Sequence, residues 1–122
     1  MNLKGKSFAV VGASNNAEKY GYRVVGALIK ISNKVFPINP KETQILGHKV
    51  FKKFAEIKEK VDIVVFVVPP AVSLSVLREI KEKKLHFWFQ PGSFDDDLLA
   101  FCKKNALIFT SDKCVIIESE KE

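Results

Sequence analysis

Short apolar runs alternate with amphipathic stretches along this chain, and this alternation strongly constrains its fold. The clearest run, 61–68, is almost continuously apolar, as expected for a parallel strand that is covered on both faces. Further strands are predicted at 8–11, 34–38, 86–89 and 107–109. Repeated strand–helix alternation predicts a parallel sheet with right-handed crossovers and helices on both faces. We therefore expect an α/β three-layer sandwich with a mainly parallel central sheet of five or six strands.

The stretches between these runs predict helices and a few minor elements. A helix begins near Gly21 and covers 22–31, a second runs from 69 to about 83, and a third from 95 to 105. Proline is tolerated in the first turn of the second helix, and Asp95 is the expected cap of the third. The minor elements are a loop through Gly47, a short edge strand at 50–51, a turn and a half of helix at 53–58, and a tail at 115–122 that crosses the sheet edge.

Length and composition limit the class of protein. With 122 residues, the chain is expected to form one domain covering 1–122. Apolar residues make up 47% and charged residues 28%, which is typical of a folded soluble protein. The longest apolar run, 61–71, is too short for a membrane span. The two cysteines have no metal-ligand spacing and no signal-peptide pattern is present, so a reduced cytoplasmic setting is expected.

The net charge of +6 does not by itself indicate a nucleic-acid partner. Lysines are concentrated in 49–60 and 78–84, where glutamates are mixed among them at helical spacing. This pattern favours a solvated helix face, because a nucleic-acid surface is typically richer in exposed aromatics and poorer in acids. We therefore expect neither a nucleic-acid nor a membrane partner, although the excess charge suits a polyanionic small molecule.

A glycine loop follows the first predicted strand. The apolar run stops at Gly12, polar residues follow, including Ser14, Asn15 and Lys19, and the next helix begins near Gly21. Such a turn points backbone N–H groups and the positive end of a helix at one place, which suits a phosphate. The loop therefore predicts a phosphorylated cofactor. The plain structural alternative is a strand-to-helix turn that happens to contain one glycine.

This loop differs from the dinucleotide fingerprint GxGxxG, since 12–15 lacks the second and third glycines. An NAD-binding domain also places Asp or Glu at the end of its second strand to bind the ribose diol. This chain instead has Ile38-Asn39-Pro40-Lys41 there. The missing carboxylate and the lysine favour a ribose that carries a phosphate, as in NADP and coenzyme A.

The segment Val67-Val68-Pro69-Pro70 ends the central strand. The carboxyl ends of central strands face the ligand crevice in open α/β sheets. Proline removes a backbone donor there and leaves an apolar wall against which adenine or a pantetheine chain could lie. The plain alternative is a strand stop followed by a helix start.

Several motifs in order resemble those of the small stand-alone CoA-binding proteins, which are similar to the N-terminal CoA-binding domain of the succinyl-CoA synthetase alpha subunit. The motifs are Val-Gly-Ala-Ser-Asn, Lys-Tyr-Gly, Pro-Ile-Asn-Pro-Lys, Ile-Leu-Gly, Val-Asp-Ile-Val-Val-Phe-Val-Val-Pro-Pro, Phe-Trp-Phe-Gln-Pro-Gly and Ser-Asp-Lys-Cys. The resemblance runs from about residue 3 to 117 and implies a Rossmann-like fold that binds coenzyme A.

The resemblance also implies roles for individual residues. The pyrophosphate loop would comprise Gly12, Ala13, Ser14 and Asn15, completed by Lys19, Tyr20 and Gly21, with Arg23 close behind. The adenosine end would meet Asn39, Pro40 and Lys41, with Lys41 near the 3′-phosphate. The apolar wall would be Val68, Pro69 and Pro70, and the pantetheine side would be bordered by Gln90, Pro91 and Gly92. Pro91 and Phe94 depart from the family pattern. The ligase's second domain, with its phosphorylated histidine, is not part of this sequence, so we expect binding without the reaction.

No set of residues predicts a catalytic centre or a metal site. His48 falls in a loop, and His86 begins a strand at the end opposite the expected crevice. Asp62 also starts a strand, where a structural role is expected. Cys102 belongs to a helix face and is expected in the core. Cys114 is expected to be buried, with the alternative that nearby Lys113 lowers its pKa.

Three functions remain open from the sequence. The leading one is non-catalytic binding of coenzyme A or an acyl-CoA. The second is an NADP-linked oxidoreductase fragment, which the missing ribose-binding carboxylate also allows. The third is a regulatory partner protein with a vestigial nucleotide site. An acyl-CoA enzyme or a second copy of the chain is the expected macromolecular partner. In the redox variant of the third function, Cys114 forms a mixed disulfide with CoA.

Overall fold

A five-stranded parallel sheet forms the centre of the computed structural model, which describes residues 2–81 and 83–122. Its strands lie in the order β2-β1-β5-β6-β7. Their bounds are Phe8–Val11 for β1, Val35–Ile38 for β2, Ile63–Phe66 for β5, His86–Phe89 for β6 and Ile108–Thr110 for β7. The chain moves outward from β1 to β2 and then returns to β5 on the other side of β1. This reversal makes β1 and β5 a topological switch point, at whose carboxyl ends open α/β sheets bind ligands.

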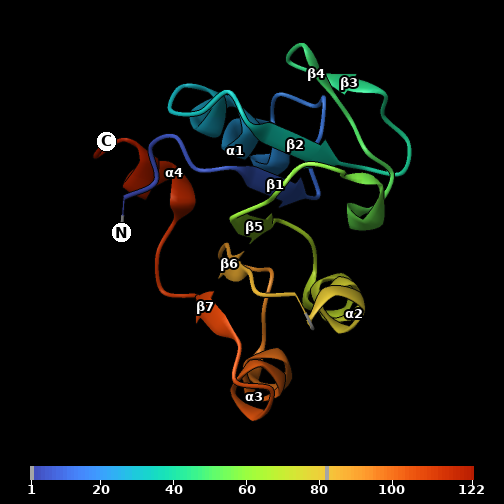
Figure 1. Ribbon diagram of the computed structural model, residues 1–122, viewed down its shortest axis with the longest axis vertical. Coiled ribbons are helices and arrows are strands. Elements are labelled where there is room, and N and C mark those ends of the chain that lie inside the picture. The colour runs from blue at the N-terminus through green and yellow to red at the C-terminus, as the bar shows by residue number, and fades with distance from the viewer. Residues whose placement is uncertain (1, 82) are drawn as a thin grey trace.

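Helices cover both faces of the sheet, which confirms the predicted three-layer Rossmann-like sandwich (Figure 1). One face carries α1 (Tyr20–Ile29) and α4 (Val115–Ser119), and the other carries α2 (Pro70–Ile80) and α3 (Asp96–Lys104). Among the described residues, none of the helices combines the length and the apolar character needed to cross a bilayer.

The two apolar cores follow from the alternation of side chains along the strands. Phe8 and Val10 of β1 belong to the core beneath α1 and α4, whereas Ala9 and Val11 belong to the core beneath α2 and α3. All four side chains are buried, as the nearly continuous apolar character of this strand requires. On the α2–α3 side, the rings of Phe66 and Phe89 stack with centroids 4.8 Å apart.

Two helix starts agree with the sequence. Pro70 stands at the first position of α2, where its missing N–H costs no helical hydrogen bond. The Asp95 side chain caps α3 by accepting a hydrogen bond from the Leu98 amide at 2.9 Å. Both predictions are confirmed. Several bounds differ by a few residues: α1 starts at Tyr20, and β5 is shorter than the apolar run at 61–68.

A hairpin stands where the sequence predicts a loop and an edge strand. It comprises β3 (Gln44–Ile45) and β4 (His48–Lys49), joined by Leu46 and Gly47, both of which have positive φ. The expected strand at 50–51 is reduced to a single parallel bridge between Phe51 and Ile38 at the edge of β2. The helix expected at 53–58 is a single 3₁₀ turn, η1 (Phe54–Glu56).

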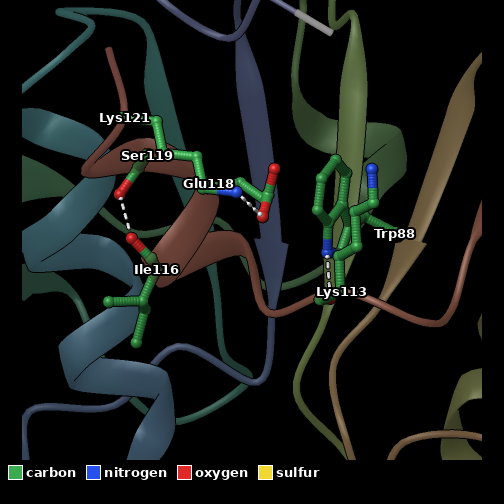
Figure 2. Close-up of polar contacts among 6 residues, drawn as sticks. All are labelled: Trp88, Lys113, Ile116, Glu118, Ser119 and Lys121. Atoms are coloured by element: carbon green, nitrogen blue, oxygen red, sulfur yellow. Dashed lines mark hydrogen bonds and ion pairs between the residues drawn. The ribbon is translucent and has the colours of Figure 1, made fainter.

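The C-terminal tail does not cross the sheet edge, so that prediction is wrong. It folds into α4 and packs beside α1, with Val115 fully buried. The segment that leads into α4 is fixed to the sheet by the indole N–H of Trp88, which donates to the Lys113 carbonyl at 2.9 Å (Figure 2). Ser119 donates back to the Ile116 carbonyl at 2.6 Å within the same helix.

Asp62 lies at the start of β5, far from the carboxyl ends of the strands, as predicted. Its carboxylate accepts hydrogen bonds from the Ser7 amide at 2.9 Å and from the Ser7 hydroxyl at 3.0 Å. These bonds, the backbone bond above all, lower the pKa of Asp62 below its ordinary value. The pair therefore joins the starts of β1 and β5 most strongly when the carboxyl group is ionised.

We predict that Asp62→Asn flattens the acid dependence of stability. A depressed pKa in the folded state stabilises the protein above the unfolded pKa of about 4, and this contribution is lost as the pH falls through the folded value. Urea unfolding at a series of pH values measures the effect. The gap between wild type and variant should be constant near pH 7 and close below about pH 4. A gap that does not change with pH would contradict this role.

Candidate nucleotide-binding site

Two glycines allow the start of α1 to pack directly on the loop after β1. Gly12 has a φ of +98°, and a Cβ there would lie 2.6 Å from Cγ1 of Val68 and 2.8 Å from the carbonyl oxygen of Val67. A Cβ on Gly21 would collide with the carbonyl oxygen of Gly12. Both positions therefore require glycine: a side chain on Gly12 would push the loop away from the segment after β5, and a side chain on Gly21 would push the helix away from the loop.

Unpaired backbone donors line this loop. Among the described residues between Gly12 and Gly21 that line the loop cavity, four have backbone amides with no acceptor in the protein: Ala13, Ser14, Tyr20 and Gly21. The first turn of α1 also contains no acidic residue, and Lys19 at its N-cap forms no side-chain cap. Free N–H groups at an uncapped helix N-terminus are what an anion such as a phosphate requires.

The loop opens into a cavity of about 380 Å³, which shares lining residues with two neighbouring cavities. On one side it shares Gly12, Asn39 and Val68 with a mostly apolar cavity of about 270 Å³ beside α2. We call this second space the β2-side cavity. On the other side the loop cavity shares Tyr20, Val67 and Val68 with a space of about 240 Å³ that reaches Pro91–Ser93. A single extended ligand could therefore run along the carboxyl ends of β2, β1, β5 and β6.

Side-chain hydrogen bonds fix the loop to the segment after β2. The Asn39 amide group donates to the Ala13 carbonyl at 2.8 Å. The Asn15 side chain donates to the Gln44 carbonyl at 2.8 Å, and its backbone N–H donates to the Glu42 carboxylate at 3.1 Å. Asn15 thus braces the loop, with both its side-chain donor and its backbone amide already engaged by the protein.

The structure brings together most of the residues that the sequence singled out. Those that line one or more of the three cavities are Gly12, Ala13, Ser14, Lys19, Tyr20, Gly21, Asn39, Pro40, Val68, Pro69, Pro91 and Gly92. The other five, namely Asn15, Arg23, Lys41, Pro70 and Gln90, do not line them. Arg23 lines a separate groove between α1 and α4.

Sequence reasoning missed two lysines at the β2-side cavity. Lys52 and Lys53 line it together with Phe54 of η1 and with Val72 and Val76 of α2. In the sequence these lysines belong to a mixed charged run that predicts only a solvated helix face. The sequence predicts an edge strand at 50–51 but not its partner, and the bridge between Phe51 and Ile38 brings the two lysines to the end of β2.

The buried side chain of Gln90 holds the start of α4 against the end of β6. It is fully buried at the end of β6, and its side-chain oxygen accepts from the Val115 amide at 2.7 Å. Its side-chain nitrogen lies 3.3 Å from Sγ of Cys114, and the Tyr20 hydroxyl lies 2.7 Å from the same sulfur. Tyr20 therefore connects the loop cavity to the start of α4 through Cys114.

The ionisation of these two side chains is coupled through their contact. Burial, followed by the hydrogen bond with Cys114, raises the pKa of Tyr20 to about 12. Burial also acts to raise the pKa of Cys114, but hydrogen bonds from Tyr20, the Ile117 amide and Gln90 outweigh it, so that this pKa is lowered. Cys114 is only partly buried, which differs from the burial that the sequence predicts. The alternative, a lowered pKa, agrees in direction, but its cause is this set of hydrogen bonds and not Lys113. Cys102 is fully buried as predicted, and burial raises its pKa to about 11.

The histidines lie away from the three cavities. His48 is in β4, where Nδ1 lies 3.2 Å from the Val35 carbonyl oxygen. His86 begins β6 at the opposite end of the sheet, as predicted, with Nε2 2.8 Å from the Thr110 hydroxyl. Burial lowers the pKa of His86, so it is held in its neutral form.

A parallel sheet with unpaired loop amides at its switch point defines a nucleotide-binding α/β domain of the Rossmann-like class. The chain belongs to the CoA binding domain family, whose model matches residues 6–120. The resemblance noted from the sequence is therefore confirmed at the level of the family.

Relatives that share the domain include much longer enzymes. The chain is 38% identical over 78 residues to an ADP-forming acetate–CoA ligase of Methanocaldococcus jannaschii, a match that covers 64% of this chain and 11% of the ligase. It is also 38% identical over 79 residues to the alpha subunit of ADP-forming acetate–CoA ligase II of Pyrococcus furiosus, covering 64% of this chain and 17% of that subunit. The chain thus spans under a fifth of each relative.

Small proteins of the same size share the whole architecture. A conserved hypothetical protein from Pyrococcus furiosus superposes with a TM-score of 0.86 at 35% identity, over 93% of this chain and 98% of that one. The fold therefore also occurs as a chain of about this length.

We predict that Gly12→Ala lowers the free energy of unfolding by about 1–3 kcal/mol, because the new methyl group combines a strained φ with overpacking against Val67 and Val68. Denaturant unfolding measures the loss. Gly92→Ala is the matched control, since Gly92 also has positive φ but has no neighbouring atom within 4 Å of the added carbon. An equal loss in both variants would show that backbone strain alone, and not the packing of the loop, is responsible.

We predict that Tyr20→Phe slows alkylation of Cys114 near neutral pH and moves the midpoint of its pH–rate profile upward. The variant removes the phenolic donor that favours the thiolate. Mass spectrometry of the peptide that contains Cys114 separates its reaction from that of buried Cys102. Tyr22→Phe serves as the control, because Tyr22 lies on α1 but lines the groove beside α4. Unchanged midpoints in Tyr20→Phe would contradict the contact.

Proposed function

We propose that this chain binds coenzyme A or an acyl-CoA without catalysing a reaction of its own. The observation that carries the proposal is the set of unpaired amides between Gly12 and Gly21, at the uncapped start of α1. They form a preorganised donor set for a pyrophosphate, because the backbone is already held by packing and by the Asn39 hydrogen bond.

The three joined cavities support one orientation of the ligand. The β2-side cavity, with its walls of Phe54, Val72 and Val76, takes the adenosine. The loop takes the pyrophosphate. The pantetheine arm leaves past Val68 and Pro69 toward Pro91–Ser93, where the lining carries few charges. This arrangement matches the chemical order of CoA, which has an apolar base, a charged centre and a long weakly polar arm.

We propose that no reaction is catalysed because of the side chains that line the three cavities. Tyr20, whose pKa is about 12, keeps its proton at neutral pH and is a poor general base. The remaining titratable side chains that line the three cavities are Lys19, Lys52, Lys53 and Glu79. Within the described part of the chain, the hydroxyls of Ser14 and Ser93 also line these cavities, but their hydrogen bonds join backbone groups and not a base of the kind that acyl transfer requires.

The relatives add independent support for the ligand. Both ligases are named for a reaction that uses CoA, and each matches this chain over about two thirds of its length. We propose that the matched domain keeps the CoA site, while the ligase reaction belongs to the rest of those longer proteins. An acyl-CoA enzyme that receives or delivers the ligand, or a second copy of this chain, is the proposed partner.

We predict that CoA raises the melting temperature of the protein, whereas NAD does not. A ligand present at a hundred times its dissociation constant adds about 2.7 kcal/mol of stability, which is roughly 10 °C for a domain of this size. Differential scanning fluorimetry with CoA, acetyl-CoA, NAD and NADPH measures the shift, and titration calorimetry gives the affinity.

The panel also separates the alternatives. A larger rise in melting temperature with NADPH than with CoA would favour the hypothesis of an NADP-linked oxidoreductase fragment over this proposal. No shift with any of the four ligands would leave a regulatory protein with a vestigial site. Gly21→Ala, which displaces the start of α1, should abolish the CoA shift even where the variant remains folded by circular dichroism.

A further inference from the structure

We propose that Lys52 and Lys53, rather than Lys41, distinguish CoA from dephospho-CoA, which lacks the phosphate on the ribose 3′ position. The inference rests on the proposed function, because it assigns the residues that recognise the adenosine end of that ligand. It differs from the sequence-based expectation, which places Lys41 near this phosphate.

The three lysines differ in whether they line the β2-side cavity. Lys52 and Lys53 both line the β2-side cavity, which shares Gly12 and Asn39 with the phosphate loop. Lys41 is exposed and lines none of the three cavities of the site. Because the 3′-phosphate is attached to the adenosine ribose, it must lie where the adenosine lies, at the cavity that Lys52 and Lys53 border.

Backbone hydrogen bonds hold the two lysines at that position. The backbone N–H of Asn39 donates to the Phe51 carbonyl at 2.9 Å, and the backbone N–H of Phe51 donates to the Pro37 carbonyl at 2.9 Å. The Lys52 amide in turn donates to the Glu56 carboxylate at 3.1 Å. The main chain is therefore fixed against the end of β2, and only the flexible lysine stems need to adjust to the ligand.

The charges around the cavity favour a phosphate on the lysine side. Both lysines have exposed side chains, and within the described residues neither forms an ion pair. Lysine stems lie along apolar walls while the ammonium groups stay in water, which puts two cations at the mouth of the cavity. Glu79 on α2 is the acidic residue that lines the same cavity, and it repels a phosphate from that wall.

Lys41 is held in a local turn directly after β2. The Asn39 side-chain oxygen accepts a hydrogen bond from the Lys41 amide at 2.8 Å, which closes an Asx turn around Pro40. The other end of the Asn39 side chain is bonded to Ala13, so this turn is fixed to the phosphate loop. Lys41, which the sequence predicts beside the ribose, is thereby held in this turn and does not line the three cavities.

The experiment compares CoA with dephospho-CoA by isothermal titration calorimetry. For the double variant Lys52→Ala/Lys53→Ala, we expect affinity for CoA to fall about tenfold or more and affinity for dephospho-CoA to fall less than about threefold. Wild type should prefer CoA by a similar factor. The double variant Lys103→Ala/Lys104→Ala removes the same charge at the end of α3 and should change neither affinity.

Each other outcome overturns the inference in a recognisable way. Equal losses for both ligands in Lys52→Ala/Lys53→Ala would show that the lysines attract the ligand only through its overall charge. A selective loss in Lys41→Ala, with the lysine pair neutral, would restore the sequence-based assignment. Equal affinity of wild type for the two ligands would mean that the 3′-phosphate is not recognised, although the proposed function would stand. Binding of neither ligand by wild type would overturn both.

Discussion

The contact between Gly21 and the carbonyl of Gly12 is the constraint on which the site depends. It brings the start of α1 so close to the loop after β1 that no side chain fits between them. The four unpaired amides that line the loop cavity lie together because of this closeness, since two belong to the loop and two belong to the first turn of the helix. The strong donor set is therefore a product of close packing between backbones, and not of any single charged side chain.

The main strands and helices could be predicted because their signals are local. The apolar run before Gly12 and the run that ends at Pro69 both correspond to central parallel strands, whose burial on two faces leaves little choice of residue. The hairpin β3–β4 has only two residues in each strand, and Leu46 carries a positive φ that leucine rarely adopts. Such a turn leaves no recognisable pattern. Similarly, the β-branched run at 115–117 favours a strand, but packing against α1 makes it helical.

The residues of the candidate site also differ in whether a local sequence pattern predicts their position. Gly12, Ser14 and Gly21 could be found from the sequence, because the strand–loop–helix pattern itself specifies where a phosphate would lie. The lysines at the β2-side cavity could not be found from the sequence. Their position depends on the bridge between Phe51 and Ile38, which forms where the chain returns to β2 after the β3–β4 hairpin. Gln90 differs from the loop residues, because its place in a recognisable motif predicts a position at the border of the pantetheine side, yet it does not line the three cavities. In the structure its side chain is used up in holding Cys114 and Val115.

The hydrogen bond from the Trp88 indole to the Lys113 carbonyl makes intrinsic tryptophan fluorescence sensitive to the segment before α4. Trp88 is the only tryptophan in the sequence, so all indole emission comes from this one position. Its partner immediately precedes Cys114, which touches Tyr20 at the edge of the loop cavity. The wavelength and intensity of the intrinsic fluorescence therefore report on the segment between the sheet and α4, next to the cysteine that contacts Tyr20.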